Sequence, residues 1–201
     1  MEKRNHPNLL DQILEHNRKF VENKEKFDIP LYHPVSKIPS KQLAVFTCMD
    51  TRLVEFLEDA LGIRRGDAKV IKNAGNTVTR PFGASIRSLM ISIFELGVKE
   101  IIVIGHKDCG MAAATAQGLK EKMLNRGISP DAIKVIEDEL EQWVDTFHHP
   151  IENVHEVVKK IRDNPFIPKD VPVHGLIFCP EDGRVELIVN GYEAMINDEA
   201  Q

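Results

Sequence analysis

The sequence predicts an α/β fold with a mostly parallel central sheet covered by helices. Short apolar runs of the length of buried strands alternate along the chain with longer segments whose apolar residues recur at helical spacing. The length of 201 residues, with 42% hydrophobic and 28% charged residues, suits a single globular domain with a sizeable core. We therefore expect one domain over residues 1–201.

The first 40 residues are expected to form an N-terminal helical arm. Residues 8–27 carry apolar side chains on roughly one stripe among charges, which predicts an amphipathic helix. Residues 28–40 contain three prolines and no helical pattern, which predicts an extended connector. The apolar stripe is more typical of a face that packs on a partner subunit than of a membrane helix.

Five apolar runs are expected to be strands. Their predicted order is 2-1-3-4, with strand 5 antiparallel at one edge, because Pro180-Glu-Asp-Gly183 is a hairpin signal between the last two. The predicted strands are Leu43–Thr47, Lys69–Ile71, Glu100–Ile104, Val173–Cys179 and Val185–Val189.

Helices are predicted between these strands. One covers Leu53–Leu61 and stops at Gly62, a second covers Pro81–Leu96, and a third begins at Cys109. Residues 119–165 contain no strand pattern and are expected to form a helical insertion. Within it, one helix begins after Ser129 and another begins at Pro150.

The composition excludes several classes of function. The net charge is −5 and no run of basic residues occurs, which argues against a nucleic-acid partner and against an anionic membrane surface. The N-terminus lacks an apolar signal core, and the longest apolar runs are too short to span a bilayer. We therefore expect a cytoplasmic protein. Its three cysteines, Cys48, Cys109 and Cys179, suit metal ligands plus one spare better than a disulfide framework.

Two groups of metal-ligating residues follow predicted strands. Cys48 ends the first strand, His106 ends the third, and Cys109 comes three positions later. In the order 2-1-3-4 these strands are neighbours, and open α/β sheets bind ligands where the connections reverse. Two thiolates and one imidazole can hold zinc and leave a fourth position for water, hydroxide or the carboxylate of Asp50, which is the layout of a catalytic site.

Asp50 and Arg52 are candidate catalytic residues. Two thiolates neutralise the charge of a zinc ion, so a water molecule on it is less acidic than on a three-histidine site. The Asp50 carboxylate is then expected to orient hydroxide on the metal, while Arg52 holds Asp50 ionised. If Arg52 released Asp50, the carboxylate could close the fourth position.

Each motif alone has an ordinary explanation. A single His-x-x-Cys is mostly chance, Cys48 alone could be a core residue, and Asp50 with Arg52 could be a surface ion pair. Their joint occurrence at two strand ends favours the zinc site.

Other potential ligands and turns are expected to be structural. Cys179 is predicted in the core, Asp108 facing solvent or a helix N-terminus, and His148–His149 in a solvated loop. Asn73-Ala-Gly-Asn76 is expected to turn with a positive φ and to wall the pocket.

At these residues the chain resembles the β-class carbonic anhydrases, most closely their compact prokaryotic branch. The match is Cys-x-Asp-x-Arg at Cys48, Asp50 and Arg52 with His-x-x-Cys at His106 and Cys109, and it extends through Cys48–Ala112. The resemblance implies one Zn²⁺ per chain bound by Cys48, His106 and Cys109, and a catalytic dyad of Asp50 and Arg52. It also implies reversible hydration of carbon dioxide to bicarbonate and a proton by zinc-bound hydroxide.

The resemblance leaves alternatives open. It implies a homodimer or a higher homo-oligomer, with the N-terminal helix over the partner, but does not separate dimer from tetramer. The same site could hydrolyse a carbon dioxide analogue, either carbonyl sulfide or carbon disulfide. A catalytically silent zinc-binding protein is a third possibility, against which the Asp50–Arg52 pair argues. Residues 119–165 are longer than we expect in the compact branch.

Overall fold

The computed structural model describes residues 8–23 and 35–199. The chain divides into two compact units, Met1–Val35 and Ser36–Gln201, and each is described by itself. Whether residues 1–201 act as a single domain with an arm and an insertion therefore stays a prediction.

The first unit contains the helix α1 (Leu9–Asn23), which confirms the predicted helix over these residues. Its end at residue 27 and most of the predicted connector lie outside the described residues. Arg18 forms ion pairs with Glu15 at 2.7 Å and Glu22 at 3.3 Å, the spacings that support a helix. Five large apolar side chains of α1 are exposed: Leu9, Leu10, Ile13, Leu14 and Val21.

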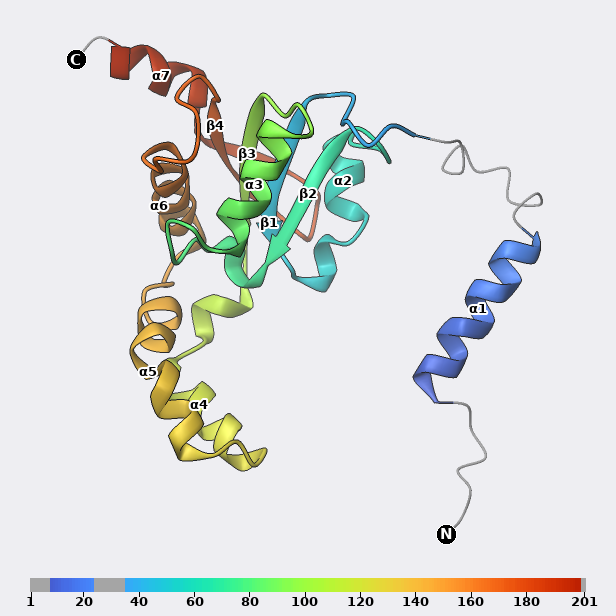
Figure 1. Ribbon diagram of the computed structural model, residues 1–201, viewed down its shortest axis with the longest axis vertical. Helices are drawn as coiled ribbons and strands as arrows, with labels where there is room; N and C mark the ends of the chain where they lie inside the picture. Colours follow the sequence, from blue (N-terminus) through green and yellow to red (C-terminus); the bar gives the residue numbers. More distant parts are fainter. Residues whose placement is uncertain (1–7, 24–34, 200–201) are drawn as a thin grey trace. The chain divides into compact units, whose positions relative to one another are not determined.

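The second unit is built on a five-stranded sheet in the order β2-β1-β3-β4-β5 (Figure 1). Its strands are β1 (Leu43–Cys48), β2 (Ala68–Asn73), β3 (Glu100–His106), β4 (Val173–Phe178) and β5 (Val185–Val189). The first four are parallel and β5 pairs antiparallel with β4. The predicted fold class and strand order are confirmed.

Both faces of the sheet are buried along its central strands β1, β3 and β4. Along β1, Ala44 and Phe46 enter one apolar cluster with residues of α3 and α6, whereas Leu43 and Val45 enter a second with residues near α2. This alternation follows from the two-residue period of a strand. The predicted metal ligands Cys48, at the end of β1, and Cys109 belong to the second cluster.

Among the described residues, some helices cover the faces of the sheet, and others extend beyond its edge (Figure 1). They are α2 (Phe56–Ala60), α3 (Ala84–Phe94), α4 (Ala116–Asn125), α5 (Pro130–Val144), α6 (Pro150–Arg162) and α7 (Gly191–Glu199). Ser129 caps α5 by accepting from the Ala132 amide, and Pro150 opens α6, as predicted. No sequence pattern predicted α7.

The helix predicted over Pro81–Leu96 is the shorter α3 (Ala84–Phe94). Two other helix predictions are wrong because the helix is interrupted. The segment predicted as one helix, Leu53–Leu61, is a 3₁₀ turn (Thr51–Leu53) followed by α2, because Val54 is extended and Glu55 has a φ of 64°. The helix predicted from Cys109 is a 3₁₀ turn over Gly110–Ala113, and α4 begins only after Thr115 caps it. Both interruptions follow a predicted metal ligand and its neighbours, where local helix propensity gives way to the geometry of the site.

The 119–165 segment has two structural roles. Helix α6 packs on β3 and β4 through buried residues that include Val154 and Val158, so it forms part of the sheet's cover. Helices α4 and α5 pack on each other around a smaller cluster of Ala116, Leu140 and Val144. Among residues 8–23 and 35–199, no helix has the length and apolar character that a bilayer crossing requires.

The close approach of α6 to the sheet generates a stability prediction. A Cβ at Gly175 would lie 2.7 Å from Val154 Cγ1 and 3.2 Å from Val158 Cγ2. We expect Gly175→Ala to lower the free energy of unfolding by about 1–3 kcal/mol, because a stiff valine cannot yield. Val154→Ala should recover part of this loss in the double variant, measured by denaturant unfolding of metal-free protein.

The matched control is Gly110→Ala, where an added Cβ would meet no atom within 4 Å. Strict additivity of Gly175→Ala and Val154→Ala would contradict the proposed steric conflict.

Candidate metal centre

Neighbouring strands bring the three predicted metal ligands together. Cys48 is the last residue of β1 and His106 the last of β3, and these strands are paired in parallel. The sulfur atoms of Cys48 and Cys109 are 4.0 Å apart, and the ligand atoms of all three residues lie within 4.8 Å of one another. All three side chains are buried. Residues 58 or more positions apart in the chain therefore converge as the sequence predicted.

The imidazole of His106 is oriented for a metal. Its Nδ1 lies 2.9 Å from the carbonyl oxygen of Lys107, which can only accept, so Nδ1 carries the proton. The lone pair is then on Nε2, which is fully buried and has no hydrogen-bond partner among the described residues. A buried nitrogen without a partner is unfavourable. Together with two cysteine sulfurs, this Nε2 forms a donor set that fits Zn²⁺.

Without a nearby cation, the ionisation of both cysteines to thiolates is energetically unfavourable. The Cys109 thiol donates to Cys48, and with the backbone amides of Gly75 and Asp50 this lowers the pKa of Cys48 to about 4. The resulting negative sulfur, together with burial, raises the pKa of Cys109 above its usual value. A divalent cation between the sulfurs removes this conflict, because it stabilises both as thiolates.

Arg52 forms hydrogen bonds with both carboxylate oxygens of Asp50. The backbone amide and Nε of Arg52 donate to Oδ1 at 2.9 and 3.0 Å, and Nη2 donates to Oδ2 at 2.8 Å. These hydrogen bonds lower the pKa of Asp50 to about 2, so the group is ionised at neutral pH. Oδ2 lies 3.8 Å from His106 Nε2, which places the carboxylate beside the metal centre. The predicted pair is therefore formed, and it faces the predicted ligands.

Asp108 is a member of this cluster that the sequence prediction missed. Its carboxylate accepts from Arg52 Nη1 at 3.0 Å, and its backbone carbonyl accepts from Nη2 at 2.7 Å. The side chain is 90% exposed, as predicted, but it still fixes the far end of the guanidinium. Its backbone has a φ of 53°, a conformation that brings the carbonyl to Arg52. Its position between His106 and Cys109 is the sequence feature that could have indicated this contact.

The remaining sequence predictions concern residues around the centre. Cys179 lies just after β4, is only half-buried, and is not part of the three-residue ligand group. His148 and His149 are exposed, which confirms the predicted solvated position. Gly75 has the predicted positive φ, 68°, and its amide donates to Cys48 Sγ at 3.4 Å. The loop thus contacts a predicted metal ligand directly.

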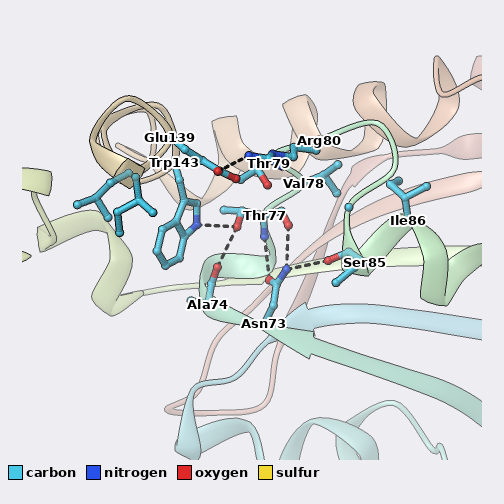
Figure 2. Close-up of a pocket in the computed structure, with 14 residues that line it drawn as sticks. Asn73, Ala74, Thr77, Val78, Thr79, Arg80, Ser85, Ile86, Glu139 and Trp143 are labelled. Atoms are coloured by element: carbon cyan, nitrogen blue, oxygen red, sulfur yellow. Dashed lines mark hydrogen bonds and ion pairs between the residues drawn. The ribbon is translucent and has the colours of Figure 1, made fainter. Parts of the chain in front are cut away.

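A pocket of about 360 Å³ is lined by residues of the same loop, by the start of α3 and by α5 (Figure 2). Thr77, Ser85 and Trp143 lie on its wall. Trp143 donates to the Thr77 hydroxyl, which donates to the Ala74 carbonyl, and the Asn73 amide donates to the Ser85 hydroxyl. No sequence pattern predicted a role for Trp143.

The fold and the site together define a class of protein. Three buried soft ligands with a nearby ionised carboxylate, at the carboxyl ends of parallel strands, are typical of a catalytic metal centre on an α/β sheet. Comparison with known proteins then identifies the family. Residues 43–185 match the family model described as carbonic anhydrase.

Individual relatives match over most of the chain. YvdA of Bacillus subtilis is 42% identical over 195 residues, which are 94% of this chain and 96% of YvdA. A carbon disulfide hydrolase of Acidithiobacillus thiooxidans is 34% identical over 157 residues, which are 73% of this chain and 76% of that relative. The crystal structure of β-carbonic anhydrase isoform I from Trichomonas vaginalis superposes with a TM-score of 0.87 at 43% identity, covering 92% of this chain and all of that one. The chain belongs to the β-carbonic anhydrase family.

The ligand assignment generates a metal-content prediction. We expect Cys48→Ser and Cys109→Ser each to lower the zinc content of purified protein well below one ion per chain, because a serine hydroxyl is a much weaker zinc ligand than a thiolate. Inductively coupled plasma mass spectrometry measures the content directly.

Cys179→Ser is the matched control, since Cys179 lies outside the ligand group. It should retain full zinc content. Equal loss of zinc in all three variants would refute the assignment.

Proposed function

We propose that the protein catalyses the zinc-dependent, reversible hydration of carbon dioxide to bicarbonate and a proton. The observation that carries this proposal is the juxtaposition of the Cys48–His106–Cys109 cluster with an Asp50 carboxylate that Arg52 holds by three hydrogen bonds. A structural zinc site needs neither Asp50 nor Arg52, so their geometry favours catalysis over a catalytically silent zinc protein.

Cys48, His106 and Cys109 would hold one Zn²⁺ per chain, and the metal when bound supplies Lewis acidity that makes a water molecule nucleophilic. Because Arg52 keeps Asp50 ionised, its carboxylate can only accept hydrogen bonds. Asp50 therefore orients the attacking water by accepting one of its protons in a hydrogen bond, and so directs a lone pair toward the substrate carbon. The three hydrogen bonds from Arg52 hold the Asp50 carboxylate in place, which disfavours its movement to the fourth metal position, while its oxygens keep acceptor capacity for the water.

The surroundings of the site suit a small apolar substrate. Cys48 and Cys109 share an apolar cluster with Leu53, Phe147 and Phe178, and Met111 packs against it. Such walls accommodate carbon dioxide, which has no strong hydrogen-bonding groups, and they exclude bulk water from the reacting atoms. Charged bicarbonate is a poorer match for these walls, which favours its release.

Carbon disulfide is a second candidate substrate, because a carbon disulfide hydrolase is among the relatives. The same ligands and the same Asp50–Arg52 pair would serve both reactions. Stopped-flow hydration of carbon dioxide and sulfide release from carbon disulfide, measured on one zinc-loaded preparation, separate the two. Zinc-loaded, folded protein without hydration activity would refute the primary proposal.

We further propose a cytoplasmic location and a homodimer or higher homo-oligomer. The described cysteines are all free thiols, which suits a reducing compartment. The exposed apolar side chains of α1 support burial against another copy of the chain. Sedimentation analysis of the full chain tests the assembly, and a monomer at micromolar concentration would contradict it.

The role of Asp50 generates an activity prediction. We expect Asp50→Asn to retain zinc but to reduce kcat by about a hundredfold or more, because an amide cannot accept hydrogen bonds on both sides as the carboxylate does. Stopped-flow hydration and metal analysis on the same sample give both quantities. Asp138→Asn, an exposed change on α5, is the control for the mutation type; a fully active Asp50→Asn enzyme would remove Asp50 from the mechanism.

The hydrogen bonds from Arg52 to Asp50 generate a prediction about the relative effects of two substitutions on kcat. Arg52→Lys should reduce kcat by about tenfold or more, because a lysine cannot replace the forked contact with Asp50. Asp108→Asn should change kcat less than about threefold, since that carboxylate is exposed and its backbone carbonyl still accepts from Arg52. If Asp108→Asn proved the more damaging of the two, Asp108 rather than Arg52 would be the main support of Asp50.

A further inference from the structure

We propose that Thr77 and Trp143 are positioning residues for the metal ligand Cys48 and act on it through a relay of three hydrogen bonds. The proposal rests on the metal centre described above, but it concerns residues that contribute no ligand and touch no reacting atom. It assigns a role in the metal site to α5, which lies within residues 119–165.

The outer half of the relay has a fixed direction. Trp143 Nε1 donates to Thr77 Oγ1 at 3.0 Å, and an indole nitrogen can only donate (Figure 2). The single hydroxyl proton of Thr77 is then donated to the carbonyl oxygen of Ala74, 3.1 Å away. Donors and acceptors are matched at each step, so no other arrangement of protons satisfies the same contacts.

The inner half passes through one peptide group. The carbonyl of Ala74 and the amide of Gly75 belong to the same peptide bond, and that amide donates to Cys48 Sγ at 3.4 Å. A donor on the carbonyl polarises the peptide and strengthens the hydrogen bond that its N–H makes. A stronger N–H···S bond withdraws negative charge from the sulfur, so the thiolate gives less of it to the metal.

The peptide is held so that it cannot rotate away. The Asn73 side chain bonds the backbone of Thr77 on both sides, accepting from its amide at 3.0 Å and donating to its carbonyl at 2.8 Å. The buried Asn153 of α6 donates to the Gly75 carbonyl at 3.0 Å. Gly75 itself admits no side chain, because a Cβ would lie 2.9 Å from Met111 and 3.0 Å from Phe147.

A purely structural explanation makes a different prediction. If Trp143 only packed α5 against the loop, its ring would matter and its N–H would not. If the relay operates, removing the N–H or the Thr77 hydroxyl alters the electronic state of Cys48 even where packing and fold are unchanged. The decisive measurement is therefore spectroscopic.

The experiment uses the full chain loaded with Co²⁺ in place of zinc. Thr77→Val and Trp143→Phe should both move the thiolate-to-cobalt charge-transfer band to longer wavelength, because the sulfur loses its support and donates more strongly. Thr77→Ser, which keeps the hydroxyl, should absorb as the wild type does. Thr146→Val is the matched control, since Thr146 also donates to a backbone carbonyl, that of Gln142, but outside the relay.

Competition with a chelator gives an independent readout. We expect Thr77→Val to weaken zinc binding by about tenfold, because the loss of the contact that fixes Cys48 in position outweighs the stronger donation of its sulfur. Trp143→Phe should add little to this loss in the double variant, because both changes break one chain of bonds.

Folded variants whose cobalt band and zinc affinity match those of the wild type would overturn the relay. A wild-type protein with no thiolate–cobalt band would instead refute the metal centre on which the proposed function depends.

Discussion

The constraint on which the rest of the site depends is the burial of two sulfur atoms 4.0 Å apart in an apolar cluster. Two negative charges at that distance and in that environment are strongly unfavourable without a cation. The Nε2 atom of His106, which has no hydrogen-bond partner among the described residues, also favours a bound cation, because it offers a lone pair to the space that the sulfurs face. The strand order brings these potential ligands together, since the pairing of β1 with β3 places Cys48 and His106 at the same edge of the sheet.

The Asp50–Arg52 pair sets what this centre can do. Four protein ligands would make a closed site, and Asp50 is near enough to the centre to be the fourth. Arg52 prevents this by engaging both carboxylate oxygens, and Asp108 holds the guanidinium from the other side. If zinc binds as proposed, these hydrogen bonds favour three protein ligands, with the fourth position left for a solvent molecule. The proposed choice between open and closed coordination would then depend on hydrogen bonds of one arginine.

The sequence predicted the sheet, its order and the five motif residues because these depend on strong local patterns and on one general rule for open α/β sheets. It did not predict the break at Val54–Glu55, since a positive φ at a glutamate has no local signature. The contact of Asp108 with Arg52 and the relay from Trp143 were also missed. Trp143 and Thr77 are 66 positions apart and meet only through tertiary packing. Hydrophobic periodicity carries no information on such pairs.

The helices of the 119–165 segment therefore do more than cover the sheet. Helix α6 contributes Val154 to the core and Asn153 to the Gly75 carbonyl, while α5 contributes Trp143 to Thr77. Both contacts converge on a loop whose Gly75 amide donates to Cys48, a predicted metal ligand. Since zinc itself imposes little geometry, the charge that its sulfurs donate and the position of its neighbours determine its reactivity. Two proteins with the same five motif residues can thus differ in chemistry if the segment that supports this loop differs, and the motif alone does not specify the substrate.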